Sequence, residues 1–347
     1  MSRGADVIVA GAGALGLSVA LALADAGCRV TVCDPADEPR ASAVAAGMLA
    51  PVFEAVLDAG AAGDLDLLLA ARNLWPALAA RAGIDIDRSG AAAVGSPAWL
   101  ASVRTGLTRL GLRGADLPRE MLEDLAPGLA PGLQGLLVRE DWRLEPRPAL
   151  AALRRAANEA GVDFRDERVT ARGGADLLVV ATGADPGLAV ALPQLRALTP
   201  IKGQILRFAE LRAGRLSLRG EGAYAVPAGD GLAVGATMEP GVADTRIDAT
   251  ALAPLSRAAE RMFPGLAGAT FTTLAGVRAA TPDGLPMVGF SATPGVILAV
   301  GARRNGWLLA PLVAQIVVAC VTGRDPGPYA RRLDPGRFDP GLFERTP

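Results

Sequence analysis

The sequence predicts an α/β protein of two lobes, in which a Rossmann-like parallel sheet with its helices carries an inserted antiparallel α+β lobe. Three observations indicate this fold class. At 347 residues the chain is long for one compact core. Near its start an apolar run, a glycine-rich turn, a helical segment and a second apolar run follow one another, which is the pattern of a βαβ unit. Between residues 201 and 238 the pattern changes to short apolar runs separated by turn residues, which is typical of antiparallel hairpins.

The first βαβ unit carries the pattern Gly-x-Gly-x-x-Gly. It begins with a strand expected at 6–10 and continues into an Ala/Leu-rich helix expected at 17–26. Between them, Gly11 permits a tight turn, Gly13 lets the backbone approach a pyrophosphate, and Gly16 lets the helix pack closely on the strand. The N-terminus of such a helix offers free N–H groups and a positive dipole end to a diphosphate.

The second strand of this unit, expected at 29–33, ends at Asp34. A carboxylate at this place can accept hydrogen bonds from the ribose of an adenosine and would repel a 2′-phosphate. The complete unit therefore predicts a bound dinucleotide, with a structural turn that binds nothing as the alternative. The glycine pattern alone does not decide which dinucleotide is bound.

The composition excludes several classes of function. The formal net charge is −1, so no long-range attraction draws the chain to nucleic acid or to an anionic membrane. The chain has no histidine, which excludes histidine-based triads and histidine metal sites. Its three cysteines lack the spacing of a metal site, so no metal is expected. With no signal-peptide pattern at the N-terminus, unpaired cysteines favour a cytoplasmic location.

Periodicity predicts the remaining elements. Helices are expected at 64–83, 147–161 and 250–262, and strands at 162–164, 175–183, 203–208, 223–227, 232–235 and 295–300. The apolar run from Trp307 to Val321 predicts a buried helix that is too short to span a bilayer. The small residues at 41–51 fit either a close approach of the backbone to a flat ligand or an ordinary helix start. The tail after Thr322 is rich in Pro and Arg and is expected at the surface.

The order of these elements predicts a discontinuous nucleotide-binding domain. It is expected to combine residues 1–83, 146–200 and 275–347. A substrate-binding domain of 84–145 and 201–274 is expected as the insertion.

Five short segments occur along the chain in one fixed order. They are Gly11–Gly16 with Asp34, Ala45-Ala46-Gly47-Met48-Leu49, Ala181-Thr182-Gly183, Gly276-Val277-Arg278 with Asp283-Gly284, and Arg304-Asn305-Gly306. In this order they resemble the D-amino-acid oxidase family of flavoproteins, and most closely the glycine oxidases of bacterial thiamine synthesis. The resemblance covers nearly the whole chain. It implies FAD as the cofactor and a FAD-binding domain of the glutathione-reductase type.

The resemblance also implies which residues surround the cofactor. Around the adenosine diphosphate it places Gly11, Gly13, Ala14, Leu15, Gly16, Asp34 and Pro35, with Val169 at the adenine. Along the pyrophosphate and flavin it places Ala41, Ser42, Ala46, Gly47, Met48 and Gly183. The segment Ala302, Arg303, Arg304, Asn305, Gly306, Trp307 and Leu308 is expected to cover the pyrimidine end of the flavin.

On the substrate side, the resemblance makes Arg278 the residue that holds the substrate carboxylate. Tyr224 is expected near that carboxylate, and Arg304 is expected as another substrate-side residue. A guanidinium suits this task because its two parallel charge-assisted hydrogen bonds fix the orientation of a carboxylate. A phosphate or structural contact remains the alternative for Arg304. Met238 matches a position beside the substrate pocket, with a flexible core residue as the alternative.

Two places depart from the pattern of the family. Ala302 stands where the family often carries histidine, so that Arg303 takes over a contact to the cofactor or the flavin edge is more open. The segment between Val169 and Ala175 is short, which indicates a trimmed hairpin near the adenine.

The function implied is the oxidative deamination of glycine or another small amino acid. The substrate amine binds neutral, hydride passes from Cα to flavin N5, and oxygen reoxidises the flavin and yields H₂O₂. The alternatives are a D-amino-acid or secondary-amine dehydrogenase with another acceptor, an NAD-dependent dehydrogenase, and a flavoprotein subunit without activity. The identity of the amino acid, a role in thiazole synthesis and a homo-oligomeric state stay open.

Overall fold

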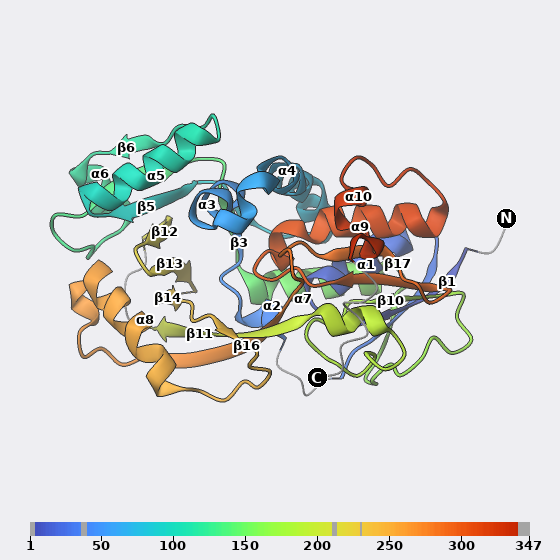
Figure 1. The fold of residues 1–347 in the computed structure, drawn as a ribbon. Helices are drawn as coiled ribbons and strands as arrows, with labels where there is room; N and C mark the ends of the chain where they lie inside the picture. The colour runs from blue at the N-terminus through green and yellow to red at the C-terminus, as the bar shows by residue number, and fades with distance from the viewer. Residues whose placement is uncertain (1–3, 36–39, 210–213, 230, 339–347) are drawn as a thin grey trace.

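The computed structural model describes residues 4–35, 40–209, 214–229 and 231–338. Two lobes lie side by side (Figure 1). One lobe contains the elements from the two ends and the middle of the chain, and the other contains the elements around β5 to β7 and β11 to β16. The two sheets described below form the centres of these lobes.

The first sheet has six strands in the order β17–β18–β10–β1–β2–β9. Its strands are β1 (Asp6–Ala10), β2 (Arg29–Cys33), β9 (Asp163–Arg165), β10 (Leu177–Val180), β17 (Met287–Phe290) and β18 (Val296–Val300). All neighbouring pairs are parallel except β17 and β18. This is the parallel sheet that the sequence predicts, and it is confirmed.

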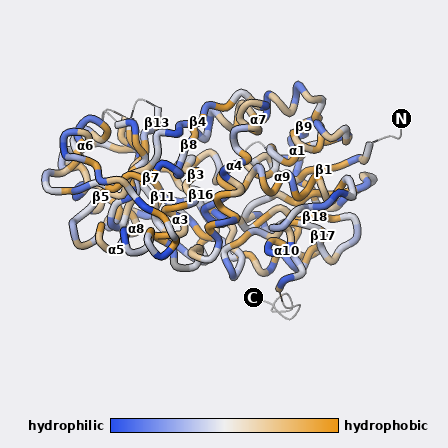
Figure 2. Tube along the Cα trace, turned by 90° about the horizontal axis from the view of Figure 1, so that it is seen from above, coloured by the Kyte–Doolittle hydropathy of each residue, from blue (hydrophilic) through white to orange (hydrophobic). Residues whose placement is uncertain are grey.

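Side chains alternate between the two faces of this sheet along each strand, and apolar residues cover both faces. Val7 and Val9 face a cluster formed with four helices, α1 (Ala14–Asp25), α4 (Leu65–Ala82), α7 (Pro146–Glu159) and α9 (Gly306–Thr322). The other face packs on apolar residues between 188 and 198. Figure 2 shows apolar stretches concentrated along β1, α1 and α9.

Helix α9 confirms the buried helix predicted from its apolar run. It packs against α1 and α4, and eleven of its 17 residues are buried. Gly323 ends it in the left-handed conformation that glycine adopts at low cost. Within the residues that the structure describes, no helix is long and apolar enough to cross a membrane.

The second sheet is mostly antiparallel and confirms the hairpins expected from the sequence. Its nine strands are β5 (Ala91–Gly95), β6 (Ala115–Leu117), β7 (Gln134–Val138), β11 (Thr199–Phe208), β12 (Ser217–Gly220), β13 (Ala223–Ala228), β14 (Gly231–Gly235), β15 (Glu239–Pro240) and β16 (Thr272–Ala280). Helices α5 (Pro97–Arg109), α6 (Arg119–Leu125) and α8 (Ala249–Met262) pack on it. Strands β11 and β16 pair along their length and run from this lobe toward the other (Figure 1).

These two long strands cross the predicted boundaries at 200/201 and 274/275. The division of the chain into two domains at those residues therefore stays a prediction.

A third, small sheet connects the lobes. It pairs β3 (Met48–Leu49) and β4 (Ile86–Asp87) with β8 (Trp142–Leu144). The short helices α2 (Ala41–Val44) and α3 (Pro51–Leu57) lie before and after β3. The segment 41–51 thus contains a helix start, and its residues also line the main cavity.

The expectation that the whole tail after Thr322 lies on the surface is wrong. Leu333, in the short helix α10 (Ala330–Leu333), is completely buried. Arg332 forms ion pairs with Asp64 and Asp66, at the start of α4. Two buried residues, Leu333 and Pro335, and the ion pairs of Arg332 dock the tail, although its composition is polar.

Asp141 is the buried residue that holds α3 in place. Its side chain is completely buried and accepts hydrogen bonds from the backbone N–H groups of Val52 (2.8 Å) and Phe53 (2.9 Å). Burial raises the pKa of Asp141 to about 7, although these two hydrogen bonds act in the opposite direction. Asp141 therefore fixes the first turn of the helix that carries Glu54.

We expect Asp141→Asn to lower the thermal unfolding midpoint, because an amide cannot accept both N–H groups with the same geometry. The loss should be roughly 1–3 kcal/mol at pH 5. A raised pKa in the folded state makes the wild type lose stability as the pH rises from about 4 toward 7. The difference between the two proteins should therefore shrink toward pH 8.

Thermal unfolding at several pH values measures this difference. Asp325→Asn, at an exposed residue that caps a surface turn, serves as the control and should change little at any pH. A difference between Asp141→Asn and wild type that is the same at pH 5 and pH 8 would contradict the account of this carboxyl.

Candidate active site

A cavity of about 930 Å³ lies where the carboxyl ends of β1, β2, β10 and β18 meet one face of the antiparallel sheet. Ligands bind at this end of the strands in open α/β sheets. The cavity is lined by these residues that the sequence singles out: Gly11, Gly13, Ala14, Leu15, Asp34, Pro35, Ala41, Ser42, Ala46, Gly47, Met48, Val169, Gly183, Tyr224, Met238, Arg278, Ala302, Arg303, Arg304, Asn305, Gly306 and Trp307. Gly16 and Leu308, the other two predicted, do not line it.

The glycine-rich turn has the geometry that its sequence demands. Gly11 has a φ of +104°, and a Cβ on it would lie 2.5 Å from the carbonyl oxygen of Ala181. Gly16 has no room for a Cβ against the carbonyl oxygen of Gly11. Gly16 thus packs the helix on the strand behind the cavity, and Gly13 leaves the start of α1 accessible.

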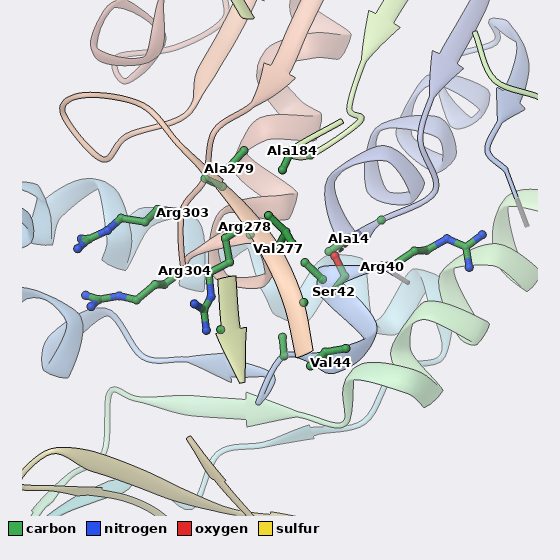
Figure 3. Close-up of a pocket in the computed structure, with 18 of the residues that line it drawn as sticks. Ala14, Arg40, Ser42, Val44, Ala184, Val277, Arg278, Ala279, Arg303 and Arg304 are labelled. Carbon is green, nitrogen blue, oxygen red and sulfur yellow. Dashed lines mark hydrogen bonds between the residues drawn. The ribbon is translucent and has the colours of Figure 1, made fainter. Parts of the chain in front are cut away.

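Asp34 is held on both of its oxygens. Oδ1 accepts a hydrogen bond from Ala12 N–H (2.8 Å), and Oδ2 accepts one from Nε of Arg40 (2.8 Å). Arg40 also lines the cavity, on the far side of Ser42 from Arg278 (Figure 3). A ribose bound here would share the carboxylate of Asp34 with a guanidinium. The sequence reasoning missed Arg40, because no motif marks this part of the sequence.

Arg278 and Tyr224 lie on the face of the antiparallel sheet that borders the cavity. In this register Arg278 is opposite Ile201 and Tyr224 is opposite Gly235. A Cβ on Gly203 would collide with the guanidinium of Arg278, and a Cβ on Gly235 would collide with the hydroxyl of Tyr224. The two glycines therefore form a floor on which the two functional side chains rest.

The guanidinium of Arg278 has no carboxylate within ion-pair distance among the residues described. Its nearest polar contacts are the carbonyl oxygen of Thr237 (3.5 Å) and Sδ of Met238 (3.4 Å). Burial lowers the pKa of Arg278 below its ordinary value, and burial also raises the pKa of Tyr224. At neutral pH this leaves a charged, poorly hydrated guanidinium beside a protonated hydroxyl.

Arg303 and Arg304 are neutralised by acids of the neighbouring helix. Arg304 pairs with Glu54 and with Asp58 (2.6 Å), and Arg303 also pairs with Asp58. Burial of Asp58 opposes ionisation, but the guanidinium groups of Arg304 and Arg303 outweigh it and hold the pKa of Asp58 below its ordinary value. Figure 3 shows both arginines directed away from Arg278.

The ion pairs of Arg304 with Glu54 and Asp58 are the structural contact that the sequence analysis gave as the alternative role of this residue. Its predicted role on the substrate side stays a prediction. Glu54 and Asp58 were missed, since nothing in their own segment marks them as partners of a loop some 250 residues away.

The N-terminus of α9 opens toward the cavity. Asn305 precedes the helix without a capping hydrogen bond from its side chain, and Gly306 and Trp307 line the cavity. Trp307 donates its indole N–H to the carbonyl oxygen of Ser42 (3.0 Å), which ties the loop to the 41–48 segment. Ala302 is buried, and its backbone bridges to Ala280.

A parallel sheet, a glycine-rich turn of the dinucleotide-binding type and a large cavity at the carboxyl ends of the strands are together typical of dinucleotide-dependent oxidoreductases. The profile of the family described as DAO, FAD dependent oxidoreductase, matches residues 6–320, and the chain belongs to this family. It is an FAD-dependent oxidoreductase, and it is similar to glycine oxidases in sequence and in fold.

The relatives agree with this placement. The bifunctional protein ThiO/ThiG of Synechocystis sp. is 29% identical over 97% of this chain and 55% of its own length. The glycine oxidase of Pseudomonas putida is 30% identical over 94% of this chain and 98% of its own length. The chain spans about half the length of the bifunctional relatives it matches. The solved glycine oxidase of Geobacillus kaustophilus superposes with a TM-score of 0.83 at 26% identity, over 97% of this chain and 100% of that one.

The residues present fit the cofactor. A cavity of about 930 Å³ is in the upper range for ligand sites. The turn at Gly11 and Gly13 lets a pyrophosphate approach the backbone, and a larger residue at Gly11 would not fit. The starts of α1 and α9 both face the same cavity and offer N–H groups to anionic parts of a ligand.

We expect Gly203→Ala to weaken the binding of carboxylates by roughly 100-fold, because the new methyl group displaces the guanidinium of Arg278 by an ångström or more. Glycolate titrated into the oxidised enzyme, followed through the visible spectrum of the flavin, measures this affinity. FAD content should not change. Gly265→Ala is the matched control, since a Cβ there meets no atom within 4 Å. Equal glycolate affinity in Gly203→Ala and wild type would show that Arg278 does not depend on this floor.

Proposed function

We propose that this chain oxidises glycine or another small amino acid and that Arg278 holds the substrate carboxylate. The observation that carries the proposal is the unpaired guanidinium of Arg278 inside the cavity. A largely buried cation without a partner is costly, so a site that keeps one is suited to an anionic ligand. The alternative structural role of an arginine, a fixed ion pair, is the one that Arg303 and Arg304 have.

The surroundings strengthen the binding of a carboxylate. A guanidinium with little access to water binds a carboxylate more strongly than an exposed one, since the local dielectric is low. Two parallel N–H···O bonds then fix both the position and the plane of the carboxylate. We assign Tyr224 a hydrogen bond to the same group, because burial keeps its hydroxyl protonated and able to donate.

The remaining lining residues would hold the cofactor. Gly11, Gly13 and Asp34 would hold the adenosine diphosphate, and Ser42 with Gly47 would lie along the pyrophosphate and flavin. The chemistry that bound FAD supplies is acceptance of a hydride from the substrate Cα, followed by transfer of the electrons to an acceptor. The N–H groups at the start of α9 would stabilise negative charge at the far end of the cavity.

No side chain of this site is required as a base. Glu54, the carboxylate beside the loop at 303–305, is occupied by Arg304 and Asn305. We therefore propose that the substrate amine loses its proton to water on binding and reacts in its neutral form. Positioning of the Cα–H by Arg278 then accounts for the contribution of the protein.

We further propose oxygen as the acceptor, which is reduced to H₂O₂. Water hydrolyses the imine to an oxo acid and ammonia, and we propose a place for the reaction in thiazole synthesis. The support is the likeness to ThiO/ThiG proteins and to glycine oxidases. A non-oxygen acceptor would leave the arrangement around Arg278 unchanged, so only oxygen consumption separates the two.

The purified enzyme should show the visible bands of oxidised flavin, lose them on addition of glycine without oxygen, and recover them with air. A spectrophotometer with an anaerobic cuvette measures all three states. Bleaching that air does not reverse would point to another acceptor. A yellow protein that ignores glycine, sarcosine and small D-amino acids would contradict the proposed activity.

Arg278→Met should reduce kcat/KM for every amino acid substrate by roughly 100- to 1,000-fold, because it removes a bidentate charge-assisted contact of roughly 3 kcal/mol or more. FAD content and the thermal unfolding midpoint should stay near wild type. Arg324→Met, at an exposed arginine outside the cavity, is the control and should retain activity. Retention of wild-type kcat/KM by Arg278→Met would contradict the assignment.

A further inference from the structure

The arginines around the cavity fall into two groups. Seven arginines line it: Arg40, Arg168, Arg219, Arg246, Arg278, Arg303 and Arg304. Five form ion pairs, namely Arg40 with Asp34, Arg168 with Asp185, Arg246 with Asp244, Arg303 with Asp58, and Arg304 with Glu54 and Asp58. Across the part of the chain that the structure describes, Arg219 and Arg278 have no such carboxylate. The cavity therefore contains a second guanidinium in the same condition as the one assigned to the substrate.

The sheet register places Arg219 on the same face as Tyr224 and Arg278. Arg219 of β12 is directly opposite Tyr224 of β13, which in turn is opposite Gly235 of β14. Residues directly opposite each other in an antiparallel pair point to the same face. On this face the guanidinium of Arg278 lies over Gly203 of β11. Tyr224 therefore lies between the two arginines.

The spacing between Arg219 and Arg278 suits a ligand that contacts both arginines. β11 and β12 are separated by β14 and β13, which makes three strand spacings, or roughly 14 Å between their backbones. Arg219 lines the cavity from β12, while the guanidinium of Arg278 lies over Gly203 of β11. What remains between them fits a short molecule with an anionic group at each end.

Arg219 also carries a buried donor without a partner. Its Nε is inaccessible to solvent and makes no hydrogen bond. The carboxyl of Asp141 acts on Arg219 only at longer range and is occupied by two backbone N–H groups. A guanidinium with an unsatisfied donor and no carboxylate partner is costly to keep in the protein, and an anion in the cavity would pair with its charge.

We propose that the preferred substrate is an amino acid with a second carboxylate, whose α-carboxylate binds Arg278 and whose other carboxylate binds Arg219. This inference rests on the proposed function and narrows its substrate class to amino dicarboxylates. Glycine and other small amino acids occupy only the Arg278 end. The oxidation of the amine is the same for amino dicarboxylates and for small amino acids.

The test measures binding separately from turnover. Dicarboxylates and monocarboxylates of equal carbon number are titrated into the oxidised holoenzyme: malonate against propionate, succinate against butyrate, and glutarate against valerate. The visible spectrum of the flavin and the thermal unfolding midpoint report binding. In the best-fitting pair the dicarboxylate should bind 10- to 100-fold more tightly, as expected for one further hydrogen-bonded charge pair. Equal affinities in all three pairs would overturn the proposal.

Variants assign the preference to Arg219. Arg219→Met should reduce the preference for the dicarboxylate at least 10-fold. Arg207→Met is the matched control, because Arg207 is on the same sheet face and also has a buried, unpartnered Nε, but it does not line the cavity. It should keep the preference. A preference that survives in Arg219→Met would overturn the proposal, and the wild-type titrations decide the question even if the variant does not fold.

Turnover separates this inference from the proposed function. Iminodiacetate should exceed sarcosine, or D-aspartate should exceed D-alanine, at least 10-fold in kcat/KM for oxygen consumption. Oxidation of glycine with no dicarboxylate preference in binding or turnover would leave the proposed function standing and remove this inference. A dicarboxylate preference in binding without oxidation of any amine would contradict the proposed function and the substrate assignment, and would leave only an anion site formed by Arg219 and Arg278.

Discussion

The unpaired, desolvated guanidinium of Arg278 is the interaction on which the candidate site depends. A buried positive charge is unfavourable unless an anion meets it, so the fold must both support the charge and keep it available. Gly203 and Gly235 support it by leaving space for Arg278 and Tyr224 to lie flat on the sheet. The guanidinium of Arg278 stays available to a ligand, because no acid among the described residues lies within ion-pair distance of it.

The other charges of the cavity are arranged differently. Arg303 and Arg304 project from the loop before α9, and Glu54 and Asp58 neutralise them from α3 and the residue after it. Asp141, the residue before β8, in turn holds the first turn of α3. A chain of buried polar contacts thus positions the loop at one end of the cavity while Arg278 stays unpaired. Comparing the paired with the unpaired arginines of the cavity also identifies Arg219, which no sequence motif marks.

The sequence predicted those features that depend on local pattern. The βαβ unit, the buried helix α9 and the hairpins of the second sheet follow from periodicity and turn residues, and the structure confirms them. Arg219, Glu54 and Asp141 could not be found in this way, because their roles arise from strand register and from contacts between distant segments. The tail after Thr322 was misjudged because composition describes all of its residues together, whereas two buried ones, Leu333 and Pro335, dock it.

The central claim is that Arg278 recognises a carboxylate by charge and not by shape. Titration of the oxidised holoenzyme with acetate and with acetamide tests it most directly, since the two molecules have nearly the same size and differ in charge. The account predicts that acetate perturbs the flavin spectrum with a dissociation constant at least 10-fold below that of acetamide, the difference expected for one charge-assisted contact. Equal affinity for the two, or no response to acetate up to high concentration, would contradict it.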